Sequence, residues 1–258
     1  MTLNYISFIT FFGYLGLGTL QILPLFGIPW LFYRSVLAHA ICLGFHGWGL
    51  YLLIDTPNGQ NMHWIIMLSL VFWLVNILIV LNALRDKNTQ ITLLTYPLTA
   101  LIVAASLILP NQDSILTNIS IRFLAHIFIS LLAISLLTFA GLQALFMGLQ
   151  QGLLKQRPPA PFLRDLPPLQ RTEALLFQTI GIGSVLLFAS LISGFLYPAL
   201  FTQGLMLKIM LALCASGLLI LLMLGRYRFG WRGRTAIRWT LSGTLLTFLS
   251  YFGSKLFL

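Results

Sequence analysis

Charge is what this sequence has least of. Only 8% of its 258 residues are Asp, Glu, Lys or Arg, while 59% are hydrophobic. A soluble domain carries about 25% charged residues. A soluble fold of this length could not cover so much apolar surface with so few charged side chains. The composition therefore excludes an ordinary soluble domain and indicates an integral membrane protein.

Cysteine is also scarce. Cys42 and Cys214 lie far apart in apolar runs, so they form no CxxC motif, no zinc-binding spacing and no disulfide framework. The N-terminal run has no Lys or Arg before it, unlike a signal peptide, and we expect it to be a retained membrane span. No P-loop, GxGxxG, HExxH or G-x-S-x-G motif occurs. Because no nucleophile with a base and no paired carboxylates are evident either, we do not expect an enzyme.

The few acidic residues stand in loops or at the ends of apolar runs. They are Asp55, Asp86, Asp113, Asp165 and Glu173. Proton- and cation-coupled transporters commonly place ionisable groups at mid-membrane. Their absence from the apolar runs argues against such a transporter.

Long apolar runs are what the sequence has in abundance. A spanning helix needs about 20 apolar residues, and backbone groups in lipid must be hydrogen-bonded within their own segment. Eight runs qualify: roughly 4–24, 35–54, 62–82, 91–109, 120–150, 174–196, 205–224 and 238–257. The sequence therefore predicts an all-α, polytopic membrane helix bundle of about eight transmembrane helices, forming one membrane domain over 1–258. We expect the long fifth helix to continue past the membrane.

Basic residues divide unevenly between the two sides of this bundle. Of the 15 Lys and Arg residues, only three fall on one side: Arg122, Lys208 and Lys255. The remainder fall on the other side, which the positive-inside rule makes cytoplasmic. Both termini then face outward, to the periplasmic side. The longest loop, 151–173, is basic, proline-rich and cytoplasmic, and serves as a connector or as a binding site for a partner.

Residues 225–238 read "GRYRFGWRGRTAIR" and contain five arginines. We predict a cytoplasmic loop of about fourteen residues between the last two spans, which is too short for a nucleic-acid-binding domain. Its arginines are suited to anionic lipid head groups, and Tyr227 and Trp231 to the membrane interface. The lipid bilayer, and no nucleic acid, is the expected partner.

Three histidines within apolar runs are candidate ligands. At a rise of about 1.5 Å per residue, His39 lies roughly 8 Å from the cytoplasmic boundary, His46 about 18 Å from it on the same helix face, and His126 roughly 10 Å from the outer boundary. His46 and His126 could therefore both ligate one metal ion, whereas His39 and His126 could not. Imidazole without acidic partners suits an axial ligand of haem iron. The alternative is a histidine that hydrogen-bonds to a neighbouring helix.

Three segments together resemble a known family. They are "RFLAHIFISLLAISLLTFAGLQALFMGLQQGLLKQR", "LPPLQRTEALLFQTIGIGSVLLFASLISGFLY" and "GWRGRTAIRWTLSGTLLTFLSYFGSKL". Their order resembles the cytochrome c assembly family (CcsA/HemX-like), specifically its YpjD-type branch of small bacterial inner-membrane proteins. The resemblance covers about 35–258 and is strongest over 120–196 and 225–255. The tryptophan-rich outer motif of the full haem exporters is absent from "YPALFTQGLMLKIM", in which only Lys208 matches.

This resemblance implies a multi-pass protein of the bacterial cytoplasmic (inner) membrane that binds or conveys haem in cytochrome c-type biogenesis. His126 is similar to the family's outer-face histidine, and His39 to the inner one. Arginines of the G-W-R-G-R region would contact haem propionates or lipid: Arg226, Arg228, Arg232 and Arg234. Haem and other membrane proteins are the implied partners.

Two other function classes stay open. A haem-free membrane scaffold or regulator would use 151–173 and 225–238 to engage another membrane complex. A small-molecule or ion transporter is the third reading, and the positions of the carboxylates disfavour it.

Overall fold

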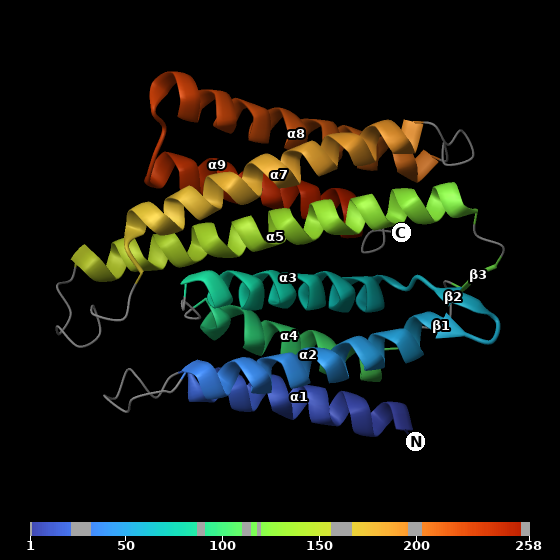
Figure 1. Cartoon of the computed structure of the whole chain (residues 1–258). Coiled ribbons are helices and arrows are strands. Elements are labelled where there is room, and N and C mark those ends of the chain that lie inside the picture. The colour runs from blue at the N-terminus through green and yellow to red at the C-terminus, as the bar shows by residue number, and fades with distance from the viewer. Residues whose placement is uncertain are drawn as a thin grey trace. The chain divides into compact units, whose positions relative to one another are not determined.

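The computed structural model describes residues 2–21, 32–86, 91–109, 115–117, 120–155, 167–195 and 203–253 (Figure 1). The described chain divides at Ser120 into two compact units. Unit 1 contains the described residues before Ser120, and unit 2 contains Ser120 and those after it. That the two units together form one membrane domain stays a prediction. Much of the predicted loop 151–173 (156–166) lies outside the described residues.

Unit 1 is built from four helices whose apolar surfaces require burial or lipid. They are α1 (Thr2–Leu20), α2 (Phe32–Ile54), α3 (Trp64–Asp86) and α4 (Thr92–Ile108). Both α1 and α3 pack against α2 and α4. Because the outer faces are apolar too, the inner face is distinguished by buried polar and small residues, as in other membrane helix bundles. Asn76 of α3, for example, donates to Thr99 Oγ1 of α4 at 2.9 Å.

A short antiparallel sheet joins connections that are far apart in sequence. Its strands, in the order β1-β2-β3, are β1 (Asp55–Thr56), β2 (Gly59–Asn61) and β3 (Ile115–Leu116). Gly59 has a φ of 132°, and a Cβ there would lie 2.5 Å from the Leu116 carbonyl oxygen. The sequence predicted an all-α bundle and gave no sign of this sheet. Strands of two or three residues have too little periodicity to be recognised in a sequence.

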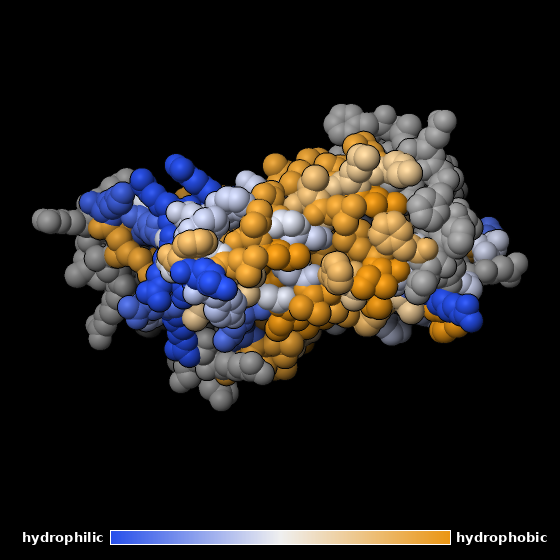
Figure 2. Space-filling model, turned by 90° about the horizontal axis from the view of Figure 1, so that it is seen from above, coloured by the Kyte–Doolittle hydropathy of each residue, from blue (hydrophilic) through white to orange (hydrophobic). Residues whose placement is uncertain are grey.

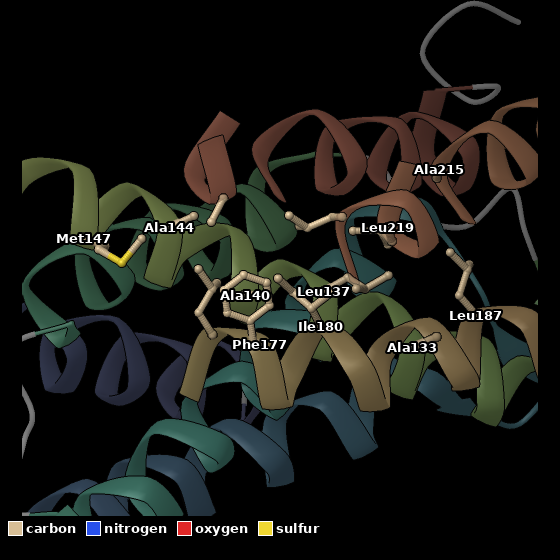
Figure 3. Packing of buried hydrophobic residues seen from close by; sticks show 13 residues of the cluster. Ala133, Leu137, Ala140, Ala144, Met147, Phe177, Ile180, Leu187, Ala215 and Leu219 are labelled. Atoms are coloured by element: carbon tan, nitrogen blue, oxygen red, sulfur yellow. The ribbon is translucent and has the colours of Figure 1, made fainter. Parts of the chain in front are cut away.

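Unit 2 contains α5 (Ile121–Lys155), α7 (Leu169–Phe195), α8 (Gln203–Phe229), α9 (Arg234–Phe248) and a π-helical turn, η3 (Leu249–Gly253). Helix α5 packs against α7 and α9, and α8 packs against the same two helices. Figure 3 shows the apolar core between them, with Leu137, Phe177, Ile180 and Leu219 among its members. A Cβ on Gly183 would lie 2.8 Å from Leu137 Cδ2. The close approach of α7 to α5 therefore depends on this glycine.

The predicted all-α membrane bundle is confirmed. Six described helices are long and apolar enough to cross a membrane: Leu3–Leu20, Val36–Ile54, Trp64–Leu84, Ile121–Lys155, Leu169–Phe195 and Met206–Phe229. The predicted long fifth helix is α5, whose 35 residues form one unbroken helix. Helix α4 is shorter, with 17 residues. The first run was predicted to extend to residue 24, whereas α1 ends at Leu20, and 22–31 lie outside the described residues.

The prediction of a fourteen-residue loop over 225–238 is wrong. Helix α8 continues to Phe229 and α9 begins at Arg234, so that only 230–233 connect them. Arginine is a good helix former, and positive charge in the last turn interacts favourably with the helix dipole, so the arginines extend α8. The chain reverses at Gly230 and Gly233, whose φ angles are 66° and 55°.

Candidate functional site

His126 lies near the beginning of α5 and faces α7. Its Nδ1 is 2.8 Å from the hydroxyl of Ser193, and the ring is half-buried. Phe123 stacks on the ring, with 6.5 Å between centroids. A Cβ on Gly194 would lie 3.3 Å from His126 Cε1. The ring thus lies against a stretch of α7 that has no bulky side chain.

Serine hydroxyls surround the backbone next to this ring. Ser193 Oγ donates to the Ser190 carbonyl at 2.9 Å, and Ser130 Oγ donates to the His126 carbonyl at 2.7 Å. The Ser130 and Ser190 hydroxyls lie 2.6 Å apart. We call these four residues of α5 and α7 the His126 seam. Within the described chain, Nε2 of His126 makes no hydrogen bond, so this nitrogen is available to a ligand.

His46 has a different environment, inside unit 1. Its Nδ1 lies 3.0 Å from the Tyr14 hydroxyl and its Nε2 lies 2.9 Å from Ser69 Oγ. The side chain is only 3% exposed. Both ring nitrogens are therefore engaged between α1, α2 and α3, which matches the alternative of a histidine that binds neighbouring helices. An iron atom could bind His46 only if one of these hydrogen bonds were broken.

His39 is also deep in unit 1. It is 2% exposed, and its ring centroid lies 5.3 Å from that of Tyr96 in α4. Tyr96 in turn contacts Tyr14 at 5.2 Å, and Tyr14 contacts His46 at 5.5 Å. The structure therefore brings His39 and His46 into one chain of aromatic contacts. His46 and His126 belong to different units, and the prediction that both could ligate one metal ion stays a prediction.

The Tyr14–His46 hydrogen bond supplies a first test of this interpretation. Replacing Tyr14 by Phe removes the hydroxyl from a buried pair, and we expect the free energy of unfolding to fall by about 1 kcal/mol, the scale of such bonds in membrane bundles. Denaturant titration of the purified protein in detergent measures the change. The matched variant is Tyr5→Phe, because Tyr5 is 67% exposed and should be neutral. Equal effects of both variants would contradict a structural role for His46.

Arg226 is held inside unit 2. Its Nη1 donates to Glu173 Oε1 at 2.9 Å, and the two side chains are only 24% and 15% exposed. Its guanidinium carbon lies 4.6 Å from the centre of the Phe177 ring. Glu173 and Phe177 both lie in the quoted segment "LPPLQRTEALLF", but nothing in the sequence predicted that they contact the same arginine. Arg226 therefore makes a protein contact, while its predicted lipid or propionate contact, like that of the neighbouring arginines, stays a prediction.

The other arginines of this region are exposed: Arg228, Arg232, Arg234 and Arg238. Figure 2 shows most hydrophilic side chains gathered at one end, where α8 and α9 connect, and mainly apolar side chains over the middle of this face. A Cβ on Gly148 of α5 would lie 3.9 Å from Ile237 of α9, and Gly148 lies roughly 33 Å along α5 from His126 at about 1.5 Å per residue. The arginines and His126 therefore belong to opposite ends of unit 2. One haem bound at His126 does not reach these arginines.

Comparison with known proteins assigns the chain to a family. A family model described as "Cytochrome C assembly protein" matches residues 30–258. The chain belongs to the cytochrome c assembly protein family. Inner membrane protein YpjD of Escherichia coli (strain K12) is 29% identical over 223 residues, which are 86% of this chain and 82% of that protein. An uncharacterized 28.8 kDa protein of Azospirillum brasilense is 33% identical over 133 residues, covering 50% of this chain and 49% of the relative. No solved structure matches the chain.

The family resemblance seen in the sequence is thus confirmed. Membership, six apolar helices of spanning length and similarity to an inner membrane protein place the chain in the inner membrane as a multi-pass protein. Within the described residues, no group of three or more His, Cys, Asp or Glu residues could hold a metal ion.

Proposed function

We propose that this protein binds haem in the inner membrane as a cytochrome c assembly-type protein, with His126 as an axial ligand. The observation that supports it is the asymmetry of the His126 ring. Nδ1 is held by Ser193, whereas Nε2 makes no hydrogen bond to a described residue and the ring is half-buried. Haem iron is commonly held by a neutral histidine of this kind.

The residues around His126 fit a haem. A histidine that ligates a metal almost always donates its other ring N–H to a neighbouring acceptor, and Ser193 occupies that position. Phe123 and the outward-facing apolar side chains of α5 and α7 suit the faces and edges of a porphyrin. When bound, haem would be the cargo of an assembly protein, and its iron supplies the redox chemistry of the cytochrome that receives it.

The proposed topology gives this site a side. We propose eight spans, the six long helices together with α4 and the helical stretch of α9 and η3, with both termini outward. In support, α9 continues directly into η3, so that helical backbone extends without a break from Arg234 to Gly253. The arginine-rich end of unit 2 is then cytoplasmic, and His126 lies toward the periplasmic side, where cytochromes c are assembled.

His39 is retained as the inner candidate, and His46 is not. A haem could reach His39 only if the packing between α2 and α4 opened, because His39 is 2% exposed. His46 already has partners for both nitrogens. The proposal therefore rests on one ligand from this chain, His126, whatever the role of His39.

An absorption spectrum tests the proposal. Protein purified in mild detergent from haem-replete cells should show a Soret band, and haem-depleted protein should regain it on addition of haemin. A colourless protein that also fails to bind haemin would refute haem binding. The haem-to-protein ratio is measured across the elution peak, which controls for contaminating haem proteins.

A second function is favoured by the exposed arginines. Arg228, Arg232 and Arg234 present positive charge at one end of unit 2 and have no acidic partner among the described residues. In a haem-free scaffold they would bind another membrane complex or lipid. Crosslinking in intact membranes distinguishes the two functions, since a scaffold should lose its partner on Arg→Gln substitution here and be indifferent to His126→Ala.

A further inference from the structure

We propose that Ser193 is a positioning residue that fixes the tautomer of His126, so that the hydrogen is on Nδ1 and the lone pair on Nε2. The inference deepens the proposed function. The expected effect on haem affinity rests on that function, whereas the expected tautomer concerns the haem-free protein alone. The inference is argued from the hydrogen bonds between α5 and α7.

The hydrogen bonds of Ser193 determine which atom donates. A serine hydroxyl has one hydrogen and two lone pairs. Ser193 Oγ lies 2.9 Å from the Ser190 carbonyl oxygen and 2.8 Å from His126 Nδ1. A carbonyl oxygen can only accept, so the hydroxyl hydrogen is used there. Ser193 Oγ must then accept from His126, and Nδ1 carries the hydrogen.

The remaining hydroxyls of the His126 seam are consistent with this direction. Ser130 Oγ donates to the His126 carbonyl at 2.7 Å, so that in the 2.6 Å contact between the two hydroxyls the hydrogen comes from Ser190. Each hydroxyl hydrogen of the seam then has one acceptor. With Nδ1 protonated, the neutral ring presents the Nε2 lone pair, the form required of a metal ligand.

The opposite arrangement fails on the same contacts. If Ser193 donated to Nδ1, its oxygen would face the Ser190 carbonyl oxygen at 2.9 Å without a hydrogen between them. Nε2 would then carry the hydrogen and could not bind iron until it lost it. The Ser190 backbone also hydrogen-bonds to the imidazole of His126. Ser193 therefore selects the ligating form together with this backbone group, and loss of Ser193 removes one of the two constraints on the tautomer.

Nitrogen NMR of haem-free protein tests the tautomer directly. With ¹⁵N-labelled histidine in detergent, protonated and unprotonated ring nitrogens are separately resolved, and the His126 signals are those lost in His126→Ala. We expect the Nδ1–H form in the wild type and in Ser193→Thr, which keeps the hydroxyl. Ser193→Ala should give a mixture or the Nε2–H form. Ser130→Ala, which changes the seam without touching the ring, should keep Nδ1–H. An Nε2–H form in the wild type would overturn the inference.

Haem affinity gives the second readout. Loss of an outer-shell partner of a ligating histidine typically lowers metal affinity about 10–100-fold, which we expect for Ser193→Ala, with recovery in Ser193→Thr. Equal haem affinity of Ser193→Ala and wild type, with His126→Ala defective, would refute the positioning role. If the wild type shows Nδ1–H and binds no haem, the tautomer assignment stands and the proposed function fails. The two failures are therefore distinguishable.

Discussion

Replacing His126 by alanine is expected to lower haem affinity by at least about 100-fold, because the loss of a direct ligand should exceed the 10–100-fold typical of an outer-shell partner. The ring of His126 is half-buried, its Nδ1 is held by Ser193, and its Nε2 makes no hydrogen bond within the described structure. Alanine removes the ring and its contact with Ser193, but it keeps the residue 126 carbonyl to which Ser130 donates. Haemin titration of detergent-purified protein, followed at the Soret band, measures the change.

The other histidines supply matched controls for this prediction. His63 lies directly before α3 and its backbone N–H donates to Asn61 Oδ1 at 3.1 Å. His63→Ala should leave haem affinity unchanged. His46→Leu should reduce stability, because Tyr14 and Ser69 lose their shared partner, and should also keep haem binding. If His46→Leu abolished binding while His126→Ala did not, the assignment of the ligand would be wrong.

Replacing Glu173 by alanine should lower the free energy of unfolding markedly, because it breaks the ion pair with Arg226. The carboxylate is the 2.9 Å partner of an arginine that is only 24% exposed. Removal of one member of a buried ion pair leaves the other uncompensated at a cost of 3–5 kcal/mol, and for this partly buried pair we expect about 2–3 kcal/mol. The ends of α7 and α8 should separate first, because the pair joins them. Thermal or denaturant unfolding in detergent measures the loss.

A double-mutant cycle separates this pair from general damage. Arg226→Ala alone loses the pair and the contact with the Phe177 ring, and the double variant should be less unstable than the two single losses combined, since neither charge is left alone. Arg228→Ala is the matched control, because Arg228 lies two residues from Arg226 on the same helix and is exposed, and should change stability by less than about 0.5 kcal/mol. Additive losses from Glu173→Ala and Arg226→Ala would contradict the ion pair.

The helical fold was predictable because lipid leaves few choices. Each long apolar run had to be a helix, and α2, α3 and α5 lie where their runs predicted. Ends were less predictable, since a helix does not stop where hydropathy falls. The basic stretch after 224 has low hydropathy, yet α8 continues to Phe229 because arginine sustains helical backbone and only Gly230 interrupts it.

The sequence predicted His126 as a candidate ligand, but it did not predict the surroundings of this histidine. The sequence identifies His126 by depth and by family resemblance, but its partner Ser193 is on another helix. Their contact depends on the register between α5 and α7, which glycines such as Gly183 and Gly194 allow. The estimated depth in the membrane made His46 as good a candidate as His126. Only the packing of α1 and α3 against α2 shows that both ring nitrogens of His46 are hydrogen-bonded. Glu173 and Arg226 were both noted in the sequence, and their pairing required the same tertiary information.

The most direct test of the central claim is electron–nuclear double resonance of the ferric haem in protein with ¹⁵N-labelled histidine. Coupling of the iron spin to a histidine nitrogen reports the ligand itself, independently of affinity or stability. The proposed ligation predicts a coupled histidine nitrogen in the wild type and in His39→Ala, and its loss in His126→Ala. Coupling that persists unchanged in haem-loaded His126→Ala would contradict the account.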